Sequence, residues 1–465
     1  MLVSLHASAT GEIGWGHYFR LSALGEELVR RGHDVFFCLE TDDRRLSARL
    51  RSLGIECITE DDLLTLRTHS LAVVDDYQPN LELVSALEVR GTRIAQIIDS
   101  GSTLRIPGAL VVRPDPLFPD DGDLSGLRYA LISSDVSKFV ENSIPRGMPV
   151  VSIVVGGAGG VVEGEIERAL IESGRCTVVR LRALMPSDLV DRSDYLRAMS
   201  SSQVCVCGAG STLWECAALG VPAVAVIVAE NQREQAKWAH ANGLCVASEG
   251  SEVDLVVQNV ELLIRDSERR LSMARQGRLV VDTNGPKRVA EFLERMTELS
   301  LRKCSLEDAH QMFDWRASDR VNRWMFSDPP TSIESHRAWL LDQLAREDKW
   351  MWIIELHGRP IGLVSLERSR DSEYLDLGIY VAEKSSSGTG RAALASAIGI
   401  AKSGGLGVGV RADVFSDNTR AINLYASMGF EKASILTSPI VKSGVIRDVV
   451  RFELMFDRSS GVGDG

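Results

Sequence analysis

One segment of the chain combines a glycine turn with two hydroxyl side chains in an order suited to binding phosphate. The apolar run Val204–Val206 predicts a buried parallel strand, after which Gly208 and Gly210 allow the backbone to turn sharply. Ser211 and Thr212 follow where a helix would begin. Because the free amides of a helix N-terminus attract anions, this segment predicts a phosphate-binding turn.

Three further side chains extend this turn toward a whole nucleotide. Glu215 lies one helical turn further on and can accept hydrogen bonds from ribose hydroxyls. Asn231 and Gln232 follow a second apolar run and could close the far side of the pocket. The alternative is an ordinary turn whose Ser and Thr only cap a helix. Taken together, the pattern resembles the nucleotide-binding half of the two-domain (GT-B) glycosyltransferase fold.

A second cluster lies near the N-terminus, where three glycines fall within six residues. Gly14 and Gly16 belong to this loop, and His17 follows at the start of an amphipathic helical segment, residues 21–31. An imidazole at the mouth of a cleft can accept a proton from water near neutral pH. The alternative is a helix-capping or surface histidine.

Several motifs together resemble the UDP-sugar hydrolases of pseudaminic acid biosynthesis. These are the Gly-x-Gly-His-x-x-Arg segment, Val-Asp-Asp-Tyr at residues 74–77, Ile98-Asp99, Gly156-Gly157 and the Gly-Ser-Thr-Leu-Trp-Glu segment. The family releases UDP from UDP-2,4-diacetamido-2,4,6-trideoxy-β-L-altropyranose by breaking the bond between sugar C1 and oxygen. The resemblance covers about residues 1–285, and its N-terminal histidine motif separates the hydrolases from related glycosyltransferases.

The resemblance implies a role for several residues of this chain. His17 matches the general base that draws a proton from the attacking water. Tyr77 could hold the sugar and Arg20 could reach a phosphate, although packing and a surface ion pair are the respective alternatives. Asp75 and Asp76 could orient Tyr77 or His17, and the sequence does not decide between them.

The C-terminal third carries another glycine loop. A strand-like run ending at Val381 is followed by a glycine loop opening an Ala-rich helix, an arrangement that forms an amide-lined cradle for pyrophosphate. The expected contacts on this loop are Gly388, Thr389, Gly390 and Arg391. Asn418 and Tyr425 follow downstream, together with the pair Gly429-Phe430.

This segment resembles the GNAT acetyltransferases. The resemblance implies that acetyl-CoA is a cosubstrate bound on the glycine loop, that Asn418 contacts CoA, and that Tyr425 is the acid toward the departing thiolate. Ser385 departs from the family, which usually has Arg or Gln there. Glu373 or Asp376 could take the proton of the amine, with a solvated strand face as the alternative. The segment around Trp324 and His336-Arg-Ala-Trp339 further resembles the N-acetyltransferase of the pseudaminic acid pathway.

The order of apolar runs predicts an α/β protein with two tandem Rossmann-like domains of GT-B type and a C-terminal GNAT α+β domain. We expect domains at residues 1–145, 146–298 and 299–458, with a tail at residues 459–465. The expected strands are Leu2–Leu5, Asp34–Cys38, Leu71–Val74, Arg93–Ile98, Leu110–Val112, the run that begins at Met148, Cys176–Leu181, Val204–Val206 and Ala223–Val228. A hairpin of Trp350–Leu356 and Ile361–Leu366 distinguishes the third domain from the first two.

Composition narrows the class of protein. The 465 residues carry a net charge of −12, which argues against a nucleic-acid or anionic-membrane surface. No apolar run approaches the roughly 18 residues that span a bilayer, and the first residues lack a secretory pattern, so we expect a cytoplasmic protein. Cys205 and Cys207 lack metal-ligand spacing, so we expect core thiols and no metal.

The combined motifs predict a bifunctional nucleotide-sugar enzyme. Its GNAT domain would acetylate the 4-amino group of a UDP-linked 6-deoxy amino sugar, and its first two domains would then release UDP from the acetylated product. Two alternatives remain open: a GT-B glycosyltransferase that passes the sugar to an acceptor, and a non-catalytic nucleotide-sugar sensor.

Overall fold

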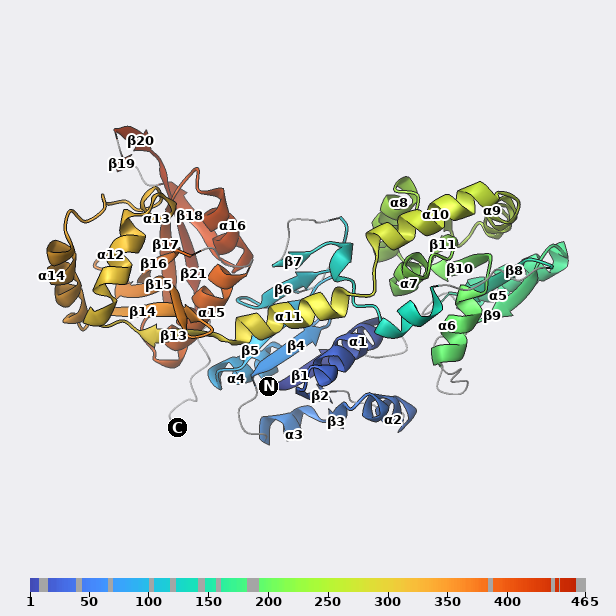
Figure 1. Cartoon of the computed structure of the whole chain (residues 1–465), viewed down its shortest axis with the longest axis horizontal. Helices are drawn as coiled ribbons and strands as arrows, with labels where there is room; N and C mark the ends of the chain where they lie inside the picture. Colours follow the sequence, from blue (N-terminus) through green and yellow to red (C-terminus); the bar gives the residue numbers. More distant parts are fainter. Residues whose placement is uncertain are drawn as a thin grey trace, which may run out of the picture. The chain divides into compact units, whose positions relative to one another are not determined.

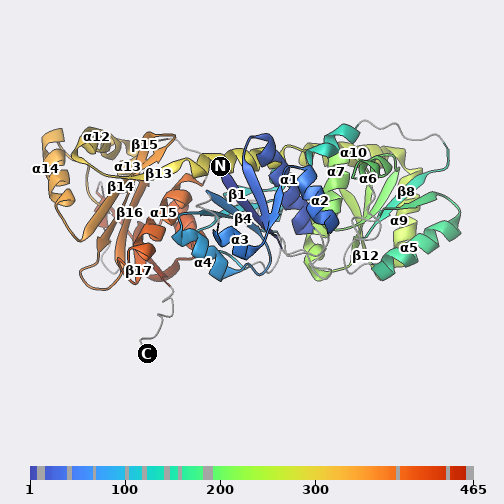
Figure 2. The same cartoon turned by 90° about the horizontal axis from the view of Figure 1, so that it is seen from below.

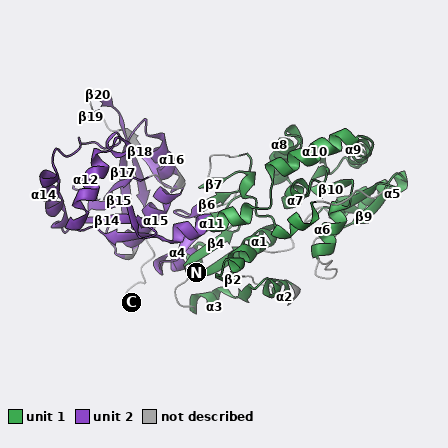
Figure 3. Ribbon diagram, viewed as in Figure 1, with its two compact units in different colours: residues 1–83, 95–104, 111–291 green, residues 84–94, 105–110, 292–465 purple. Residues whose placement is uncertain are grey.

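The structure, a computed structural model, describes residues 1–7, 16–38, 44–65, 70–99, 104–117, 123–140, 147–155, 160–181, 192–383, 388–435, 440–442 and 444–456 (Figure 1). The chain divides into two compact units (Figure 3). The first comprises residues 1–83, 95–104 and 111–291, and the second comprises residues 84–94, 105–110 and 292–465. Among the described residues, no helix is long and apolar enough to cross a membrane.

The first sheet has seven strands in the order β3-β2-β1-β4-β5-β6-β7. Its strands are β1 (Leu2–Ala7), β2 (Asp34–Cys38), β3 (Glu56–Ile58), β4 (Leu71–Asp75), β5 (Arg93–Ile97), β6 (Leu110–Arg113) and β7 (Leu124–Ser125). The helices between them are α1 (Gly16–Arg30), α2 (Arg44–Ser52), α3 (Glu60–Thr65) and α4 (Leu81–Val89). Strand β1 pairs in parallel with both β2 and β4, so the strand order reverses direction at β1 and β4. Ligands of such sheets bind beyond the carboxyl ends of the strands at this reversal.

The second sheet has five strands in the order β12-β11-β10-β8-β9, and its described pairings are parallel. Its strands are β8 (Val150–Val154), β9 (Thr177–Arg180), β10 (Val204–Gly208), β11 (Ala223–Ile227) and β12 (Cys245–Glu249). Its helices are α5 (Gly160–Ser173), α6 (Arg192–Ser200), α7 (Ser211–Leu219), α8 (Arg233–Ala241), α9 (Val253–Arg265), α10 (Ser267–Val280) and α11 (Gly285–Thr297). Short 3-10 helices η1 (Leu127–Tyr129) and η2 (Ser134–Phe139) precede β8, and η4 (Glu230–Gln232) follows β11.

Apolar side chains cover both faces of this second sheet, as its strand sequences require. One face is covered by α5 and α9, which lie side by side (Figure 2). The other face packs against α6, α7 and α8. The direction of the strand order changes between β8 and β10, so the turn after β10 lies at the second reversal point of the first unit.

The second unit contains a mixed sheet in the order β13-β14-β15-β16-β17-β21-β18. Its strands are β13 (Leu299–Lys303), β14 (Lys349–Leu356), β15 (Arg359–Arg368), β16 (Leu375–Val381), β17 (Gly409–Phe415), β18 (Glu431–Ile435) and β21 (Val449–Met455), and β19 (Ile440–Lys442) and β20 (Val445–Arg447) form a separate hairpin. Its helices are α12 (Ala309–Ala317), α13 (Asp319–Asn322), α14 (Ile333–Leu344), α15 (Thr389–Ser403), α16 (Thr419–Ser427) and the 3-10 helix η5 (Leu306–Asp308). Helices α12 and α14 lie on one side of this sheet and α15 on the other (Figure 1).

The hairpin expected from the sequence is confirmed, because β14 and β15 pair in antiparallel fashion from Lys349–Glu367 to Leu356–Arg359. The expected fold class is confirmed as well: two parallel sheets are followed by a mixed sheet. The sequence missed the short strand β3 and strand β12, which lack a long apolar run.

Candidate functional site

A buried histidine and aspartate meet at the first reversal point. His17 is the second residue of α1, and Asp75 is the last residue of β4. Their exposed fractions are 4% and 1%, and the His17 Nδ1 atom lies 2.6 Å from Asp75 Oδ1. The geometry follows from the sheet register, because β1 and β4 pair side by side and α1 starts from the loop after β1.

Arg20 joins this pair and a second carboxylate. Its Nε and Nη2 atoms donate to the two oxygens of Asp75 at 3.0 and 2.8 Å, and its Nη1 atom donates to Asp99 Oδ2 at 2.8 Å. Burial alone would lower the pKa of Arg20, but Asp75 and Asp99 raise it above its usual value. Burial opposes ionisation of Asp99, yet Arg20 holds the pKa of Asp99 below its usual value. The sequence suggested a phosphate contact for Arg20, whereas the structure places Arg20 in these two ion pairs.

The hydrogen bonds around Asp75 determine which histidine nitrogen can act as a base. Arg20 Nη2 lies 2.8 Å from His17 Nδ1, and both groups also approach Asp75 Oδ1. Since the carboxylate can only accept, His17 Nδ1 carries a proton and donates a hydrogen bond to Asp75. The contact between Arg20 Nη2 and His17 Nδ1 is then a contact between two donors and not a hydrogen bond. The Nε2 atom is then the nitrogen that can accept a proton.

Tyr77 packs against the same imidazole. Its ring meets the His17 ring edge-on, with 4.7 Å between centroids, and its hydroxyl donates to Asp99 Oδ2 at 3.4 Å. Burial and the charge of Asp99 raise the pKa of Tyr77 to about 12. Tyr77 therefore remains a neutral hydrogen-bond donor near neutral pH.

An open pocket in the first unit adjoins this cluster. The pocket wall includes Arg20, Ser211, Thr212 and Glu215, which the sequence had proposed as substrate contacts. Asn231 and Gln232 are not among the described residues of this wall.

Helix α7 presents its N-terminus to this pocket. Gly210 is the residue before the first turn, and no side chain caps that turn among the described residues. Gly16 lies close by, since a Cβ atom on it would meet Ser211 Oγ at 3.7 Å. Because an uncapped helix N-terminus offers backbone N–H groups and partial positive charge, the pocket can bind phosphate there.

Glu215 is held on the pocket wall by two partners that the sequence did not reveal. Arg192 of α6 forms an ion pair with Glu215, and the Tyr195 hydroxyl donates to Glu215 Oε2 at 3.4 Å. The exposed fractions of the Arg192 and Glu215 side chains are 14% and 13%. Twenty-three residues separate the two in the chain, so no short motif indicates the pair.

Asn231 and Gln232, also proposed for this site, lie outside the pocket wall. Asn231 is exposed, and the Gln232 side-chain oxygen accepts a hydrogen bond from the Val228 backbone at 3.2 Å. Gln232 thus supports the turn after β11. Gly14 and Gly157 lie outside the described residues.

In the second unit, the glycine loop opens helix α15. Gly388 precedes the helix with a φ of 86°, a left-handed conformation that favours glycine. Thr389 and Arg391 are buried at the start of the helix, and a Cβ atom on Gly390 would lie 3.5 Å from Leu424. Ser385, the departure from the family pattern, lies outside the described residues.

Strands β16 and β17 pair over only part of their length. Their parallel register includes Leu375–Val410 and Asp376–Arg411, whereas β16 continues to Val381. The two strands are therefore joined at the amino end of β16 and not along its carboxyl half. Val381 lies at that unpaired end, and its backbone oxygen accepts a hydrogen bond from Arg320 Nε at 3.4 Å.

Tyr425 is buried in α16 between aromatic side chains. Its ring centroid lies 5.4 Å from that of Phe430 and 5.9 Å from that of Phe452. Burial and the nearby charge of Asp413 raise the pKa of Tyr425 well above its usual value, which keeps the phenol protonated. Asn418 caps α16, since its side-chain oxygen accepts a hydrogen bond from the Ala421 backbone at 3.2 Å.

The two carboxylates considered as bases for acetyl transfer lie at the paired end of β16. Asp376 forms an ion pair with Arg411, and Arg411 also contacts Asp371 at 2.7 Å. Glu373 is exposed just before the strand. These positions place Asp376 in a salt-bridge network at the end of β16 opposite Val381.

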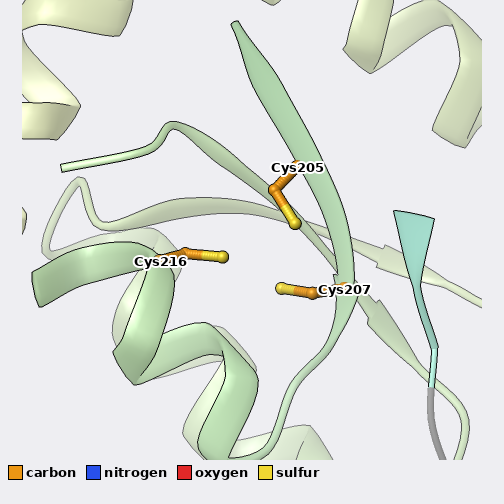
Figure 4. A group of neighbouring side chains, drawn as sticks. All are labelled: Cys205, Cys207 and Cys216. Carbon is orange, nitrogen blue, oxygen red and sulfur yellow. The ribbon is translucent and has the colours of Figure 1, made fainter. Parts of the chain in front are cut away.

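Three buried cysteines form a cluster beneath the turn after β10. The sulfur atoms of Cys205, Cys207 and Cys216 lie within 4.8 Å of one another and point toward a common centre (Figure 4). The Met199 sulfur lies 3.8 Å from Cys216 Sγ. Hydrogen bonds among the thiols, together with burial, hold the pKa of Cys207 and of Cys216 well above its usual value. The same hydrogen bonds hold the pKa of Cys205 below its usual value. All three cysteines belong to the apolar core that packs against α6, α7 and α8.

Two protein-family models match separate parts of the chain. Residues 186–291 match the glycosyltransferase family 28 C-terminal domain, and residues 298–431 match the acetyltransferase (GNAT) domain. The first match includes β10 and α7, and the second includes β16, α15 and Tyr425. No curated protein matches the chain.

Solved acetyltransferases are similar to the C-terminal third. The spermidine N-acetyltransferase from Vibrio cholerae, solved with CoA and spermine, is 19% identical, and the match covers 34% of this chain and 96% of that chain with a TM-score of 0.33. A ribosomal L7/L12 alpha-N-protein acetyltransferase is 15% identical, with 34% and 91% of the respective chains covered and a TM-score of 0.31. A second crystal of that enzyme contains coenzyme A.

Proposed function

We propose that the chain is a bifunctional nucleotide-sugar enzyme with three domains, at residues 1–145, 146–298 and 299–458. The GNAT domain acetylates the 4-amino group of a UDP-linked 6-deoxy amino sugar with acetyl-CoA. The first unit then hydrolyses the acetylated product, UDP-2,4-diacetamido-2,4,6-trideoxy-β-L-altropyranose, to UDP and free sugar. This pair of reactions belongs to pseudaminic acid biosynthesis and takes place in the cytoplasm.

The observation that carries the hydrolase proposal is the 2.6 Å contact between His17 Nδ1 and Asp75 Oδ1. Asp75 fixes the tautomer of the imidazole and stabilises the positive charge that forms when Nε2 accepts a proton. Location at the reversal point of a parallel sheet, beside the pocket that Arg20 and Ser211 line, supports the same role.

In the proposed reaction, water attacks the anomeric carbon while His17 Nε2 accepts one of its protons. The bond between C1 and the phosphate oxygen breaks, and its electron pair leaves with UDP. The N-terminus of α7 stabilises the charge that develops on the diphosphate, so no strong general acid is required. Tyr77 lies beside the imidazole and donates to Asp99, so its hydroxyl oxygen is left to accept a hydrogen bond from a sugar hydroxyl.

In the acetyl transfer, the sugar amine attacks the thioester carbonyl and loses a proton to solvent water, and the carbon–sulfur bond breaks. The Tyr425 hydroxyl, kept protonated by its raised pKa, donates a proton to the departing thiolate of CoA. The pyrophosphate of CoA binds at the N-terminus of α15, where Gly388, Thr389, Gly390 and Arg391 form the loop. Val381 and Asn418 are the further contacts proposed for CoA.

A glycosyltransferase is the second candidate, because residues 186–291 match a glycosyltransferase domain. Both candidates use the same nucleotide pocket and differ only in what attacks the sugar. A hydrolase forms free sugar with water alone, whereas a glycosyltransferase needs an acceptor molecule.

The test is UDP release from the acetylated UDP-sugar without any acceptor, followed by mass spectrometry of the sugar product. We expect free sugar, and we expect His17→Ala to lower kcat by about 10²–10⁴-fold, the usual contribution of a general base. The matched control is His33→Ala, which removes a histidine just beyond the other end of α1. UDP release that is undiminished in His17→Ala would refute the hydrolase role.

A further inference from the structure

Two arginines line the nucleotide pocket without a role in the mechanism above. Arg49 projects from α2 and Arg192 from α6, and both belong to the pocket wall that includes Ser211 and Thr212. Arg20, the third arginine of the wall, is already neutralised by Asp75 and Asp99. The wall thus brings two additional guanidinium groups to the α7 N-terminus.

The two guanidinium groups share one aromatic ring. The central carbon of Arg49 lies 5.7 Å from the centroid of the Phe19 ring, and that of Arg192 lies 5.9 Å from the same centroid. Arg192 also lies 5.0 Å from the Tyr195 ring. Stacking on rings limits the rotation of a guanidinium plane, so both groups are oriented before a ligand arrives.

In the described part of the chain, Arg49 and Arg192 have hydrogen-bond donors without acceptors, and the charge of Arg49 has no carboxylate in ion-pair contact. The Nε atoms of Arg49 and Arg192 are buried and lack a hydrogen-bond partner among the described residues. Glu215 compensates the charge of Arg192, whereas Arg49 forms no ion pair with a described residue. Burial lowers the pKa of Arg49, and the positive charge of Arg192 lowers it further, although Tyr18, Asp135 and Glu26 oppose this shift. Two neighbouring cations with unused donors call for an anion between or beside them.

We propose that Arg49 and Arg192 bind the diphosphate of the nucleotide substrate, as a second anchor in addition to the α7 N-terminus. This inference rests on the proposed nucleotide-sugar function and assigns the anion-binding side chains of the same pocket. A guanidinium suits this ligand because its planar fork donates two parallel hydrogen bonds to phosphate oxygens. Arg192 in addition orients Glu215, so the same residue joins the diphosphate subsite to the predicted ribose contact.

The two arginines also affect the chemical step. When the bond between C1 and oxygen breaks, the leaving diphosphate gains negative charge. A cation bound to it then interacts more strongly than in the ground state, and such an interaction raises kcat. Arg49, which lacks a compensating carboxylate, is expected to contribute more to this effect than Arg192.

The test compares Arg49→Gln with Arg51→Gln in the full chain by calorimetry with three probes: inorganic pyrophosphate, UDP and uridine. Arg51 lies on the same helix and is exposed, so its substitution makes the same change of charge outside the pocket. We expect Arg49→Gln to weaken pyrophosphate and UDP about 10- to 100-fold, the usual effect of losing a charged hydrogen bond. Uridine binding should be unchanged in both variants.

The outcomes separate this inference from the proposed function. Equal weakening of UDP by Arg49→Gln and Arg51→Gln would overturn the subsite, because net charge alone would then explain the loss. The wild-type chain could instead bind pyrophosphate through Arg49 but neither bind UDP nor release it from the UDP-sugar. This result would support the anion subsite and refute the nucleotide-sugar function. Arg49→Lys is the control for misfolding, because it keeps the positive charge. If Arg49→Lys binds pyrophosphate more tightly than Arg49→Gln, the loss of affinity comes from direct contact with the anion.

Discussion

At the scale of single residues, the chemistry of His17 depends on the carboxylate beneath it. Asp75 accepts hydrogen bonds from His17 and from Arg20, and Arg20 is fixed in turn by Asp99. The positive charge of Arg20 is thereby balanced by the carboxylates of Asp75 and Asp99. The network holds one imidazole nitrogen as a donor and leaves the other as a base.

The first prediction concerns Asp75. We expect Asp75→Asn to lower kcat for UDP release by about 10²–10⁴-fold with a small change in KM, because the amide no longer fixes the tautomer of His17 or stabilises its positive charge. Steady-state kinetics on the acetylated UDP-sugar measures both constants. The control is Asp76→Asn, whose carboxylate accepts from the Gln78 backbone. An equal loss in the two variants would argue against a specific link between Asp75 and the imidazole.

The residue scale also shows what the sequence could not provide. Glycine spacing drew attention to His17, and the sequence left Asp75 and Asp76 as equal candidates for its partner. The position at which β4 ends identifies Asp75 as the partner of His17, because Asp75 is the last residue of β4 and lies beside the carboxyl end of β1. Arg192 and Arg49 escaped notice because they come from helices whose approach to α7 is a matter of tertiary packing.

At the scale of elements, the position of the turn after β10 depends on how closely α10 packs against α7. A Cβ atom on Gly277 of α10 would lie 2.7 Å from the Ala217 carbonyl oxygen and 3.0 Å from the Ala217 Cα atom. Since neither backbone atom can move without shifting its helix, Gly277 is what permits this approach.

The second prediction uses a pair of helix glycines. Gly277→Ala should lower the free energy of unfolding by about 1–3 kcal/mol, because α10 must move away from α7. Gly164→Ala in α5, where a Cβ atom would meet nothing within 4 Å, should raise it by about 0.5–1 kcal/mol through the better helix propensity of alanine. Denaturant unfolding of the full chain measures both. Equal effects would mean that the contact with Ala217 does not matter.

The third prediction concerns the N-terminus of α15. Gly388→Ala should raise KM for acetyl-CoA about tenfold or more, because a left-handed alanine costs about 1–2 kcal/mol and displaces the first amides of the helix. The control is Gly405→Ala, which places the same strain just beyond the other end of α15 at a φ of 58°. If both variants raise KM alike, the loop before α15 is not the CoA site.

The elements themselves were largely predictable. Long apolar runs such as those of β4, β10 and β11 have no other stable place than a buried parallel sheet, and the turn residues between them mark the helices. The partial pairing of β16 with β17 could not be predicted, because it depends on strands that meet only in the folded sheet.

At the scale of the whole molecule, the residues proposed for the two reactions lie in separate compact units. The proposed reactions follow one another, since the acetylated product of one site is the substrate of the other. Two family models matching different residues agree with this division.

The fourth prediction is that variants of the two proposed sites stop the two-step reaction at different compounds. Supplied with the UDP-4-amino sugar and acetyl-CoA, Tyr425→Phe should accumulate the unacetylated UDP-sugar, whereas His17→Ala should accumulate the acetylated UDP-sugar. Mass spectrometry of the reaction mixtures distinguishes the two. Accumulation of free unacetylated sugar by Tyr425→Phe would show that hydrolysis does not require prior acetylation.

The central claim is that a water molecule activated by His17 attacks the sugar carbon and not the phosphorus. Hydrolysis of the acetylated UDP-sugar in water enriched in oxygen-18 tests this directly. The account predicts that the label appears in the C1 hydroxyl of the sugar and that UDP remains unlabelled. Label in the β-phosphate of UDP would contradict it, because attack would then have occurred at phosphorus.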